Sequence, residues 1–307
     1  MKQFRLEDIK PHLGKNWEIL GDPSDKYFTE VKAIFEASKD SLVWVNSTRR
    51  DRQQLIEKTE AAIIICDRNI DITDKLKRNK CLVIVDSPKL IFLRIVAALF
   101  STKMKYETHP SAVIEPEAEI HNETYIGPYT YIGRSSIGKG SIVHGHCHIC
   151  DGVIIGERVT IDAGAVVGPE GFGFAKNEAG KWERFPHIGG VLIHDDVEIG
   201  ANTCVARGTL GNTEIREGAK IDCHVQVSHN VIVGKGAIIA AFAIISGSSS
   251  IGDDAWIAPG AVITDGITIG QGATIGPGAV VLSSVADFAK VVGKPAMPLP
   301  REYWNKG

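Results

Sequence analysis

Apolar β-branched residues recur at every sixth position through most of this chain. An α-helix cannot keep a strict period of six, because its faces repeat every 3.6 residues. A solenoid of short strands and turns can, since each inward residue then stacks on its counterpart in the next coil. We predict three hexads per coil, with residues 18 apart stacked. The longest run is Ile215, Ile221, Val227, Val233, Ile239, Ile245, Ile251, Ile257, Ile263, Ile269, Ile275 and Val281.

Shorter runs of the same hexad begin at Ile114, Ile137 and Ile193, so the solenoid is predicted over 113–292. The pattern breaks at 168–190 and again around Ala206–Asn212. Insertions in a solenoid project as loops from one face, which is often the binding face. Residues 293–307 are expected to form a C-terminal tail.

The first 105 residues follow a different pattern, which predicts a small α/β domain. Short β-rich runs occupy 41–46, 61–66 and 81–86. Helical composition over 49–60 lies between the first two runs, and Ser87-Pro88 opens a second predicted helix through Phe100. The polar stretch 101–112 is expected to be a linker.

Bulk composition restricts the partners. The net charge of the 307 residues is -3, which does not favour nucleic acid or an anionic membrane. The N-terminus lacks an apolar signal region, and no run spans a bilayer, so we expect no membrane insertion and a cytoplasmic protein. The six cysteines are scattered and expected to be reduced. The Cys147-x-x-Cys150 spacing is not expected to bind metal, because Ile149 keeps its inward place in the hexad.

Beyond the repeat, several motifs resemble the UDP-3-O-acylglucosamine N-acyltransferases of lipid A synthesis. The resemblance implies a left-handed β-helix, a homotrimer and a site between neighbouring β-helices. It covers most of the chain. The motifs are Gly168-Pro169-Glu170-Gly171-Phe172-Gly173-Phe174, Trp182, Pro186-His187-Ile188-Gly189, Val197 to Ala201, and Ile221-Asp222 through Ser228-His229-Asn230.

Three departures from that family bear on the substrate. The family stacks an aromatic on uracil three residues before an Asn, whereas Val43 stands there before Asn46, and Arg49 replaces a second aromatic. A second active-site His is absent from the turn at Asp265. The family's C-terminal helical arm is missing, and the segment through Lys294 to Ala296 resembles coenzyme A-using sugar acetyltransferases.

Forming an amide from a thioester needs a base for the amine proton and a donor for the oxyanion. His229 is the predicted base by resemblance, although it could also only line the cleft, and His224 and His144 are weaker alternatives. Gly247, 18 residues later, is implied as the oxyanion donor, or else serves a turn. Asp222 could orient the imidazole, bind sugar hydroxyls, or bond a turn amide.

Other predicted contacts divide between the two substrates. Phe172, Gly173, Phe174 and Trp182 lie on the insertion and are expected to touch the substrate. Asn46 and Arg49 are candidates for binding the nucleotide. Arg49 could form a bidentate pair with a diphosphate or could simply face solvent. The acyl donor is expected at Gly247, Asp265, Lys290 and Lys294.

We therefore expect an N-acyltransferase with no permanently bound cofactor. The departures favour a short, possibly hydroxylated acyl-CoA as donor and a dTDP- or UDP-linked amino sugar of a surface glycan as acceptor. The first alternative is the lipid A enzyme itself, which uses an acyl carrier protein. An O-acetyltransferase of the same superfamily leaves the N-terminal domain unexplained. A non-catalytic β-solenoid is disfavoured by the two insertions and His229.

Overall fold

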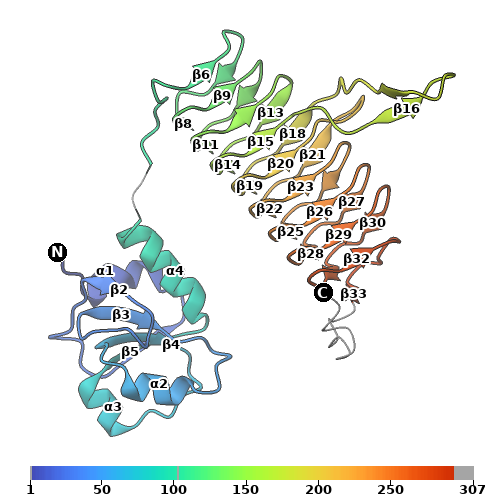
Figure 1. Cartoon of the computed structure of the whole chain (residues 1–307). Helices are drawn as coiled ribbons and strands as arrows, with labels where there is room; N and C mark the ends of the chain where they lie inside the picture. The colour runs from blue at the N-terminus through green and yellow to red at the C-terminus, as the bar shows by residue number, and fades with distance from the viewer. Residues whose placement is uncertain (1, 102–103, 294–307) are drawn as a thin grey trace, which may run out of the picture. The chain divides into compact units, whose positions relative to one another are not determined.

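The computed structural model describes residues 2–101 and 104–293, which divide into two compact units, Met1–Lys103 and Met104–Gly307. Each unit has its own hydrophobic core. The first is an α/β unit and the second is a parallel β-helix, so the predicted fold class is confirmed (Figure 1). No helix among the described residues is long and apolar enough to cross a membrane.

The N-terminal unit is a five-stranded sheet in the order β1-β5-β4-β3-β2, in which only β1 is antiparallel to its neighbour. The three β-rich runs and the two helices expected from sequence are present. The strands β1 and β2 and the helices α1, η1 and α3 were not predicted. The bounds are α1 Leu6–Ile9, η1 Lys10–His12, β1 Trp17–Leu20, β2 Glu30–Val31, β3 Ser41–Trp44, α2 Arg52–Lys58, β4 Ile63–Cys66, α3 Asp74–Asn79, β5 Cys81–Val85 and α4 Pro88–Leu99.

The β-helix has three parallel sheets, each named here by its first strand. The β6 sheet contains β6 Val113–Ile114, β9 Tyr131–Ile132, β12 His148–Ile149, β15 Val166–Val167, β20 Cys204–Val205, β23 Gln226–Val227, β26 Ile244–Ile245, β29 Val262–Ile263 and β32 Val280–Val281. The β7 sheet contains β7 Glu119–Ile120, β10 Ser136–Ile137, β13 Val153–Ile155, β18 Val191–Ile193, β21 Thr213–Ile215, β24 Ile232–Val233, β27 Ser250–Ile251 and β30 Thr268–Ile269. The β8 sheet contains β8 Tyr125–Ile126, β11 Ile142–Val143, β14 Thr160–Ile161, β19 Glu198–Ile199, β22 Lys220–Ile221, β25 Ile238–Ile239, β28 Trp256–Ile257, β31 Thr274–Ile275 and β33 Lys290–Val291.

The 18-residue register predicted from the repeat is present in the strand pairing. Val227 pairs with Ile245, and Ile245 pairs with Ile263 in the next coil. These side chains are fully buried, and the hexad residues form one continuous core through the coils. Burying an Ile or Val side chain contributes about 1.5–3 kcal/mol, so the stacked rows are the main source of stability.

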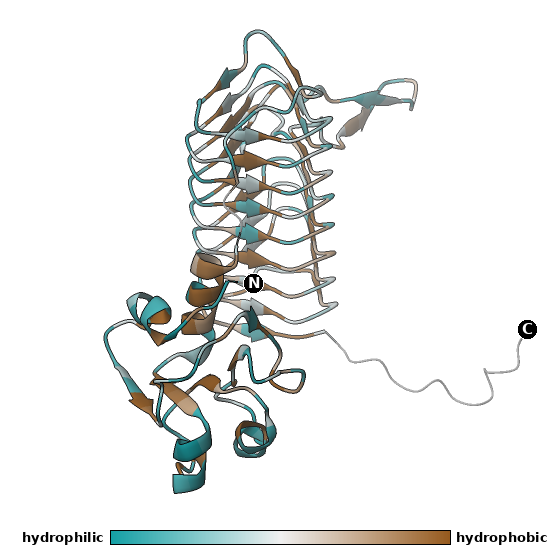
Figure 2. Ribbon diagram, turned by 90° about the vertical axis from the view of Figure 1, so that its left-hand side faces the viewer, coloured by the Kyte–Doolittle hydropathy of each residue, from teal (hydrophilic) through white to brown (hydrophobic). Residues whose placement is uncertain are grey.

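Both interruptions of the repeat leave the β-helix at the same corner, where a strand of the β6 sheet leads into the β7 sheet. The first insertion joins β15 to β18 and carries a two-stranded hairpin, β16 Phe174–Lys176 and β17 Trp182–Arg184. The second joins β20 to β21 one coil later. The hairpin projects as an arm from the stacked coils (Figures 1 and 2). We call this edge the β6–β7 corner.

Candidate functional site

His229, Gly247 and Asp265 lie one above another at the β6–β7 corner. They occupy equivalent turns after β23, β26 and β29, because a coil contains 18 residues. A Cβ placed on Gly247 would lie 2.8 Å from His229 Nε2 and 2.8 Å from Asp265 Oδ1. Glycine is therefore the residue that lets the backbone of this turn lie directly against the imidazole.

The His229 imidazole has a defined tautomer. Its Nδ1 lies 3.1 Å from Asn230 Oδ1, and that same oxygen accepts from the Thr209 backbone N–H at 3.1 Å and from Thr209 Oγ1 at 2.6 Å. A backbone N–H can only donate, so Asn230 Oδ1 is an acceptor and His229 Nδ1 carries the proton. The other nitrogen, Nε2, is left with its lone pair on the side of Gly247, as a base requires.

The two insertions meet beside His229. Thr209, from the second insertion, holds Asn230 through its N–H and hydroxyl, and its carbonyl accepts from the backbone N–H of Ile188 in the first insertion. Arg207 holds the start of the first insertion by donating to the carbonyl of Gly168 at 2.7 Å. The second insertion therefore holds Asn230, which in turn holds the His229 imidazole. The sequence analysis did not assign this role to Asn230 or Thr209.

Removing the Asn230 carboxamide should release the His229 ring. We expect Asn230→Ala to lower the rate constant for acyl transfer roughly 10- to 100-fold, less than loss of the base itself, because the ring can then rotate and change tautomer. Asn230→Asp retains an acceptor and should keep most of the activity. Steady-state kinetics on both variants tests this expectation, and equal losses in the two would contradict it.

A pocket of about 700 Å³ opens at this corner, lined by Phe172, Gly173, Phe174, Trp182, His229 and Asp265. The structure therefore brings the four residues predicted on the insertion together with the predicted base. Phe172 is 85% exposed and Trp182 is 66% exposed. Large exposed aromatic side chains around a pocket are typical of a binding surface for an apolar group.

Asp222 does not lie in this pocket. It follows β22, at the corner where the β8 sheet leads into the β6 sheet. Its carboxylate accepts from the backbone N–H groups of Cys223 at 2.7 Å and Ala241 at 3.2 Å. Among the described residues the partner of His229 Nδ1 is Asn230, so the expectation that Asp222 orients the imidazole is not met within the chain. The weaker base candidates His144 and His224 lie at the same corner as Asp222.

The remaining predicted residues lie elsewhere. Lys290 is in β33 of the β8 sheet and does not line the pocket. Lys294 falls outside the described residues. Asn46 and Arg49 follow β3 in the N-terminal unit, where Asn46 Oδ1 accepts from the Thr48 N–H at 3.0 Å. Arg49 donates from Nε and Nη2 to the two carboxylate oxygens of Asp51, at 2.7 and 2.6 Å, and lowers the pKa of that carboxyl group. An exposed ion pair of this kind contributes little to stability, so a diphosphate could displace Asp51.

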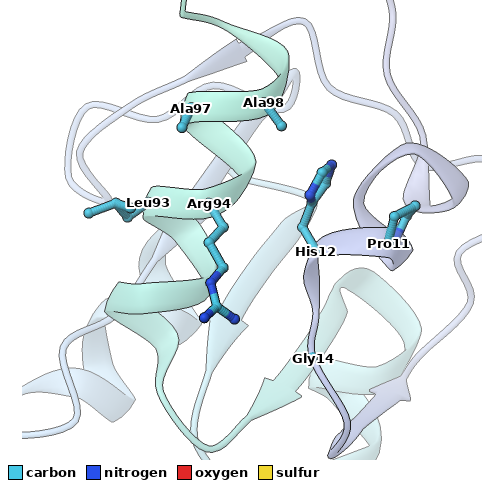
Figure 3. A pocket seen from close by; sticks show the side chains of 7 residues that line it. All are labelled: Pro11, His12, Gly14, Leu93, Arg94, Ala97 and Ala98. Atoms are coloured by element: carbon cyan, nitrogen blue, oxygen red, sulfur yellow. The ribbon is translucent and has the colours of Figure 1, made fainter. Parts of the chain in front are cut away.

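Val43, which stands at the family's aromatic position, and the next residue, Trp44, both contribute to the interior of the N-terminal unit. Val43 is fully buried in β3, and Trp44 packs against Phe92 with ring centroids 6.1 Å apart. A separate pocket of about 570 Å³ lies between η1 and α4 and is lined by Pro11, His12, Gly14, Leu93, Arg94, Ala97 and Ala98 (Figure 3). None of the predicted site residues lines it.

The cysteine pair at 147 and 150 gives no sign of a metal centre. Cys147 is buried against the β-helix core, and burial raises the pKa of its thiol to about 11. The Cys147 thiol donates to the carbonyl oxygen of Asp162, with Sγ and the oxygen 3.1 Å apart. No group of three or more potential metal ligands converges in the part of the chain that the structure describes.

A parallel β-helix of hexapeptide repeats with a histidine-lined pocket at one corner defines a hexapeptide-repeat acyltransferase. A family model described as "Bacterial transferase hexapeptide (six repeats)" matches residues 212–247 and 248–283. Solved structures of similar fold include the UDP-N-acetylglucosamine acyltransferase from Campylobacter jejuni, which has a TM-score of 0.56 and 23% identity and covers 61% of this chain and 71% of its own. The UDP-N-acetylglucosamine acyltransferase of Francisella novicida has a TM-score of 0.54 and 21% identity, with coverage of 61% of this chain and 67% of its own. At these identities the likeness shows the fold alone.

Sequence relatives are more specific. The UDP-3-O-acylglucosamine N-acyltransferase of Pseudomonas entomophila is 38% identical over 246 residues, which cover 72% of this chain and 68% of the relative. That of Leptothrix cholodnii is 32% identical over 251 residues, with coverage of 75% and 71%. The chain belongs to the UDP-3-O-acylglucosamine N-acyltransferase family, and it is an acyltransferase.

This membership confirms the resemblance found in the sequence and corrects the activity inferred from the departures. The expected enzyme, which transfers a short acyl group from acyl-CoA to a dTDP- or UDP-linked amino sugar of a surface glycan, is wrong, because the relatives carry the name that was kept as the alternative. The departures at Val43 and Arg49 lie in the N-terminal unit, whereas the family motifs build most of the His229 pocket. The missing second histidine belongs to the turn at Asp265, which also lines that pocket.

Proposed function

We propose that this chain transfers an acyl group from the thioester of an acyl carrier protein to the amine of UDP-3-O-acylglucosamine. The acceptor is the substrate in the names of its relatives, and the donor is the one implied by the family resemblance. The observation that carries the proposal is the His229 imidazole, held by Asn230 with its free Nε2 beside Gly247 in an aromatic-lined pocket.

The chemistry follows from the positions of these groups. The amine nitrogen of the sugar attacks the thioester carbonyl carbon, and His229 Nε2 takes a proton from that nitrogen. The negative charge moves to the carbonyl oxygen, toward the backbone N–H of Gly247, which donates no hydrogen bond among the described residues. The C–S bond then breaks, the amide forms, and the departing thiolate takes the proton from the imidazolium.

The projecting arm supplies the apolar part of the site. We assign Phe172, Gly173, Phe174 and Trp182 to binding the substrate's acyl groups, since their exposed surfaces are apolar and border His229. Asp265 lies on the other side of Gly247 and is assigned to the donor, because the pantetheine arm carries amide N–H groups that a carboxylate can accept. Asn46 and Arg49 remain candidates for the nucleotide, and Lys290 and Lys294 for the donor's phosphate.

The decisive assay offers the purified chain UDP-3-O-acylglucosamine with one hydroxyacyl group on either an acyl carrier protein or coenzyme A. We expect a product that has gained one acyl group as an amide, formed faster from the carrier protein. Mass spectrometry, with and without mild base that cleaves esters, separates amide from ester. No product, or only a base-labile one, would overturn the proposal.

We further propose that the active form is a homotrimer. On the outward side of the β6 sheet, Ile244 and Val280 are exposed apolar side chains two coils apart, with the half-buried Val262 between them, and Val280 is 62% exposed. Val113 is a further exposed apolar residue in the first strand of this sheet. A flat apolar face of this kind on a β-solenoid suits contact with another copy of the chain.

Placing a charge on this face should weaken the assembly. We expect sedimentation of the wild-type protein to give three times the 33.2 kDa mass of one chain. Ile244→Glu should shift it to smaller species, because an unpaired carboxylate would be buried in the interface. Thr160→Glu, on the outward side of the β8 sheet, is the matched control. A wild-type monomer with full activity would contradict the trimer.

A further inference from the structure

His187 is a buried histidine for which sequence reasoning had no role. It lies in the first insertion, after the hairpin, and only 3% of its surface is exposed. Its ring packs against the ring of His229, with centroids 5.1 Å apart and planes at 62°. A buried polar side chain in edge contact with the candidate base requires a physical explanation.

The orientation of the His187 ring is determined by one hydrogen bond. Nδ1 lies 2.9 Å from the carbonyl oxygen of Phe185, which can only accept, so Nδ1 carries the proton. The other nitrogen, Nε2, is buried and has no hydrogen-bond partner among the described residues. Burying an acceptor without a hydrogen-bond partner is unfavourable, so two hydrogen bonds to the ring cannot be the reason that a histidine stands here.

The loop that lines the pocket leaves room for both rings. A Cβ on Gly171 would lie 2.7 Å from His187 Nε2 and 2.9 Å from His229 Cβ, and a Cβ on Gly173 would lie 3.0 Å from His187 Cε1. Gly173 and His229 line the pocket, whereas His187 does not. His187 therefore lies behind the pocket wall, in contact with the imidazole on one side and with the glycine loop on the other.

We propose that His187 is a positioning residue for His229. Its ring, pinned by the Phe185 carbonyl, limits the rotation of the His229 imidazole on the side that Asn230 does not hold. Together the two contacts keep Nε2 directed at Gly247. This inference rests on the proposed function in taking His229 as the base, but the contact it describes is independent of the substrate.

Two measurements test the proposal. In kinetic assays we expect His187→Ala to lower kcat roughly 10- to 100-fold while KM for both substrates changes less than about threefold, since the residue does not touch substrate. His187→Asn, whose amide can still donate to the Phe185 carbonyl, should retain the fold and fall between wild type and His187→Ala. It keeps the test valid if alanine prevents folding.

The second measurement does not depend on activity. Diethyl pyrocarbonate modifies accessible imidazoles, and trypsin releases His224 and His229 in one peptide, residues 221–235, so His224 serves as an internal reference. We expect His187→Ala to raise the modification rate of His229 relative to His224. If the wild-type enzyme made no amide but this rate still rose, the proposed function would fail and the positioning role would stand.

Comparing Gly171→Ala in the wild-type protein with Gly171→Ala in the His187→Ala variant tests whether the contact between the two rings causes the effect. The added methyl group would push into both histidines in the wild-type background, whereas in His187→Ala only the contact with His229 Cβ would remain. We therefore expect Gly171→Ala to cost less in the double variant than alone. A kcat for His187→Ala within twofold of wild type, or an unchanged His229 modification rate, would overturn the proposal.

Discussion

Replacing His229 with alanine should lower the turnover number by about 10²- to 10⁴-fold, the range that a positioned general base contributes. The loss should appear mainly in kcat, because the amine still binds but must lose its proton to solvent or to the departing thiolate. The thermal midpoint should change little, since His229 lies in a turn and not in the buried rows of Ile and Val.

His121→Ala is the matched control for this variant. His121 is likewise a turn histidine of the β-helix, although more exposed than the half-buried His229, and its Nδ1 accepts only the backbone N–H of Glu123 among the described residues. We expect it to retain wild-type turnover. If His229→Ala lost less than tenfold, His229 would be a residue that positions the substrate and not the base.

Gly247→Ala should have the second largest effect, a loss in kcat of about 10²-fold, comparable to removing one oxyanion donor. The added Cβ would lie 2.6 Å from His229 Cε1 and 2.8 Å from its Nε2, so the imidazole must move. Folding should be preserved, because Gly247 does not adopt a positive φ angle.

Gly211→Ala provides the comparison. A Cβ there meets no heavy atom within 4 Å, and the backbone is likewise outside the positive φ region. Steady-state kinetics and thermal unfolding should show Gly211→Ala close to wild type in both respects. Similar losses in the two variants would mean that stiffening of the β6–β7 corner, and not the contact with His229, limits the rate.

Gly247 and Asp222 show how far sequence spacing predicts a site. Because a coil contains 18 residues, Gly247 and Asp265 had to lie in the same column as His229, and the structure places them there. The spacing of seven residues from Asp222 to His229 instead spans one side of the triangle, from one corner to the next. The two side chains consequently emerge at different edges of the β-helix, and the orienting group is the adjacent Asn230.

The N-terminal unit likewise shows which parts of the structure the sequence predicts and which it does not. The runs at 41–46, 61–66 and 81–86 predicted its buried strands, because continuous apolar runs are typical of a sheet covered on both faces. The edge strands β1 and β2 were missed. They are short or half-exposed, and their pairing with β5 and β3 comes from contacts distant in sequence.

The repeat was sufficient to predict the β-helix, its coil length and the column of residues at the β6–β7 corner, since a strict period leaves the backbone one regular way to stack its apolar side chains. The contacts that hold the His229 imidazole are determined only by the tertiary structure. Thr209, Asn230 and His187 come from two insertions and a turn, and no periodicity relates them. Irregular loops converge through packing and individual hydrogen bonds, which depend on the folded positions of the coils that carry them.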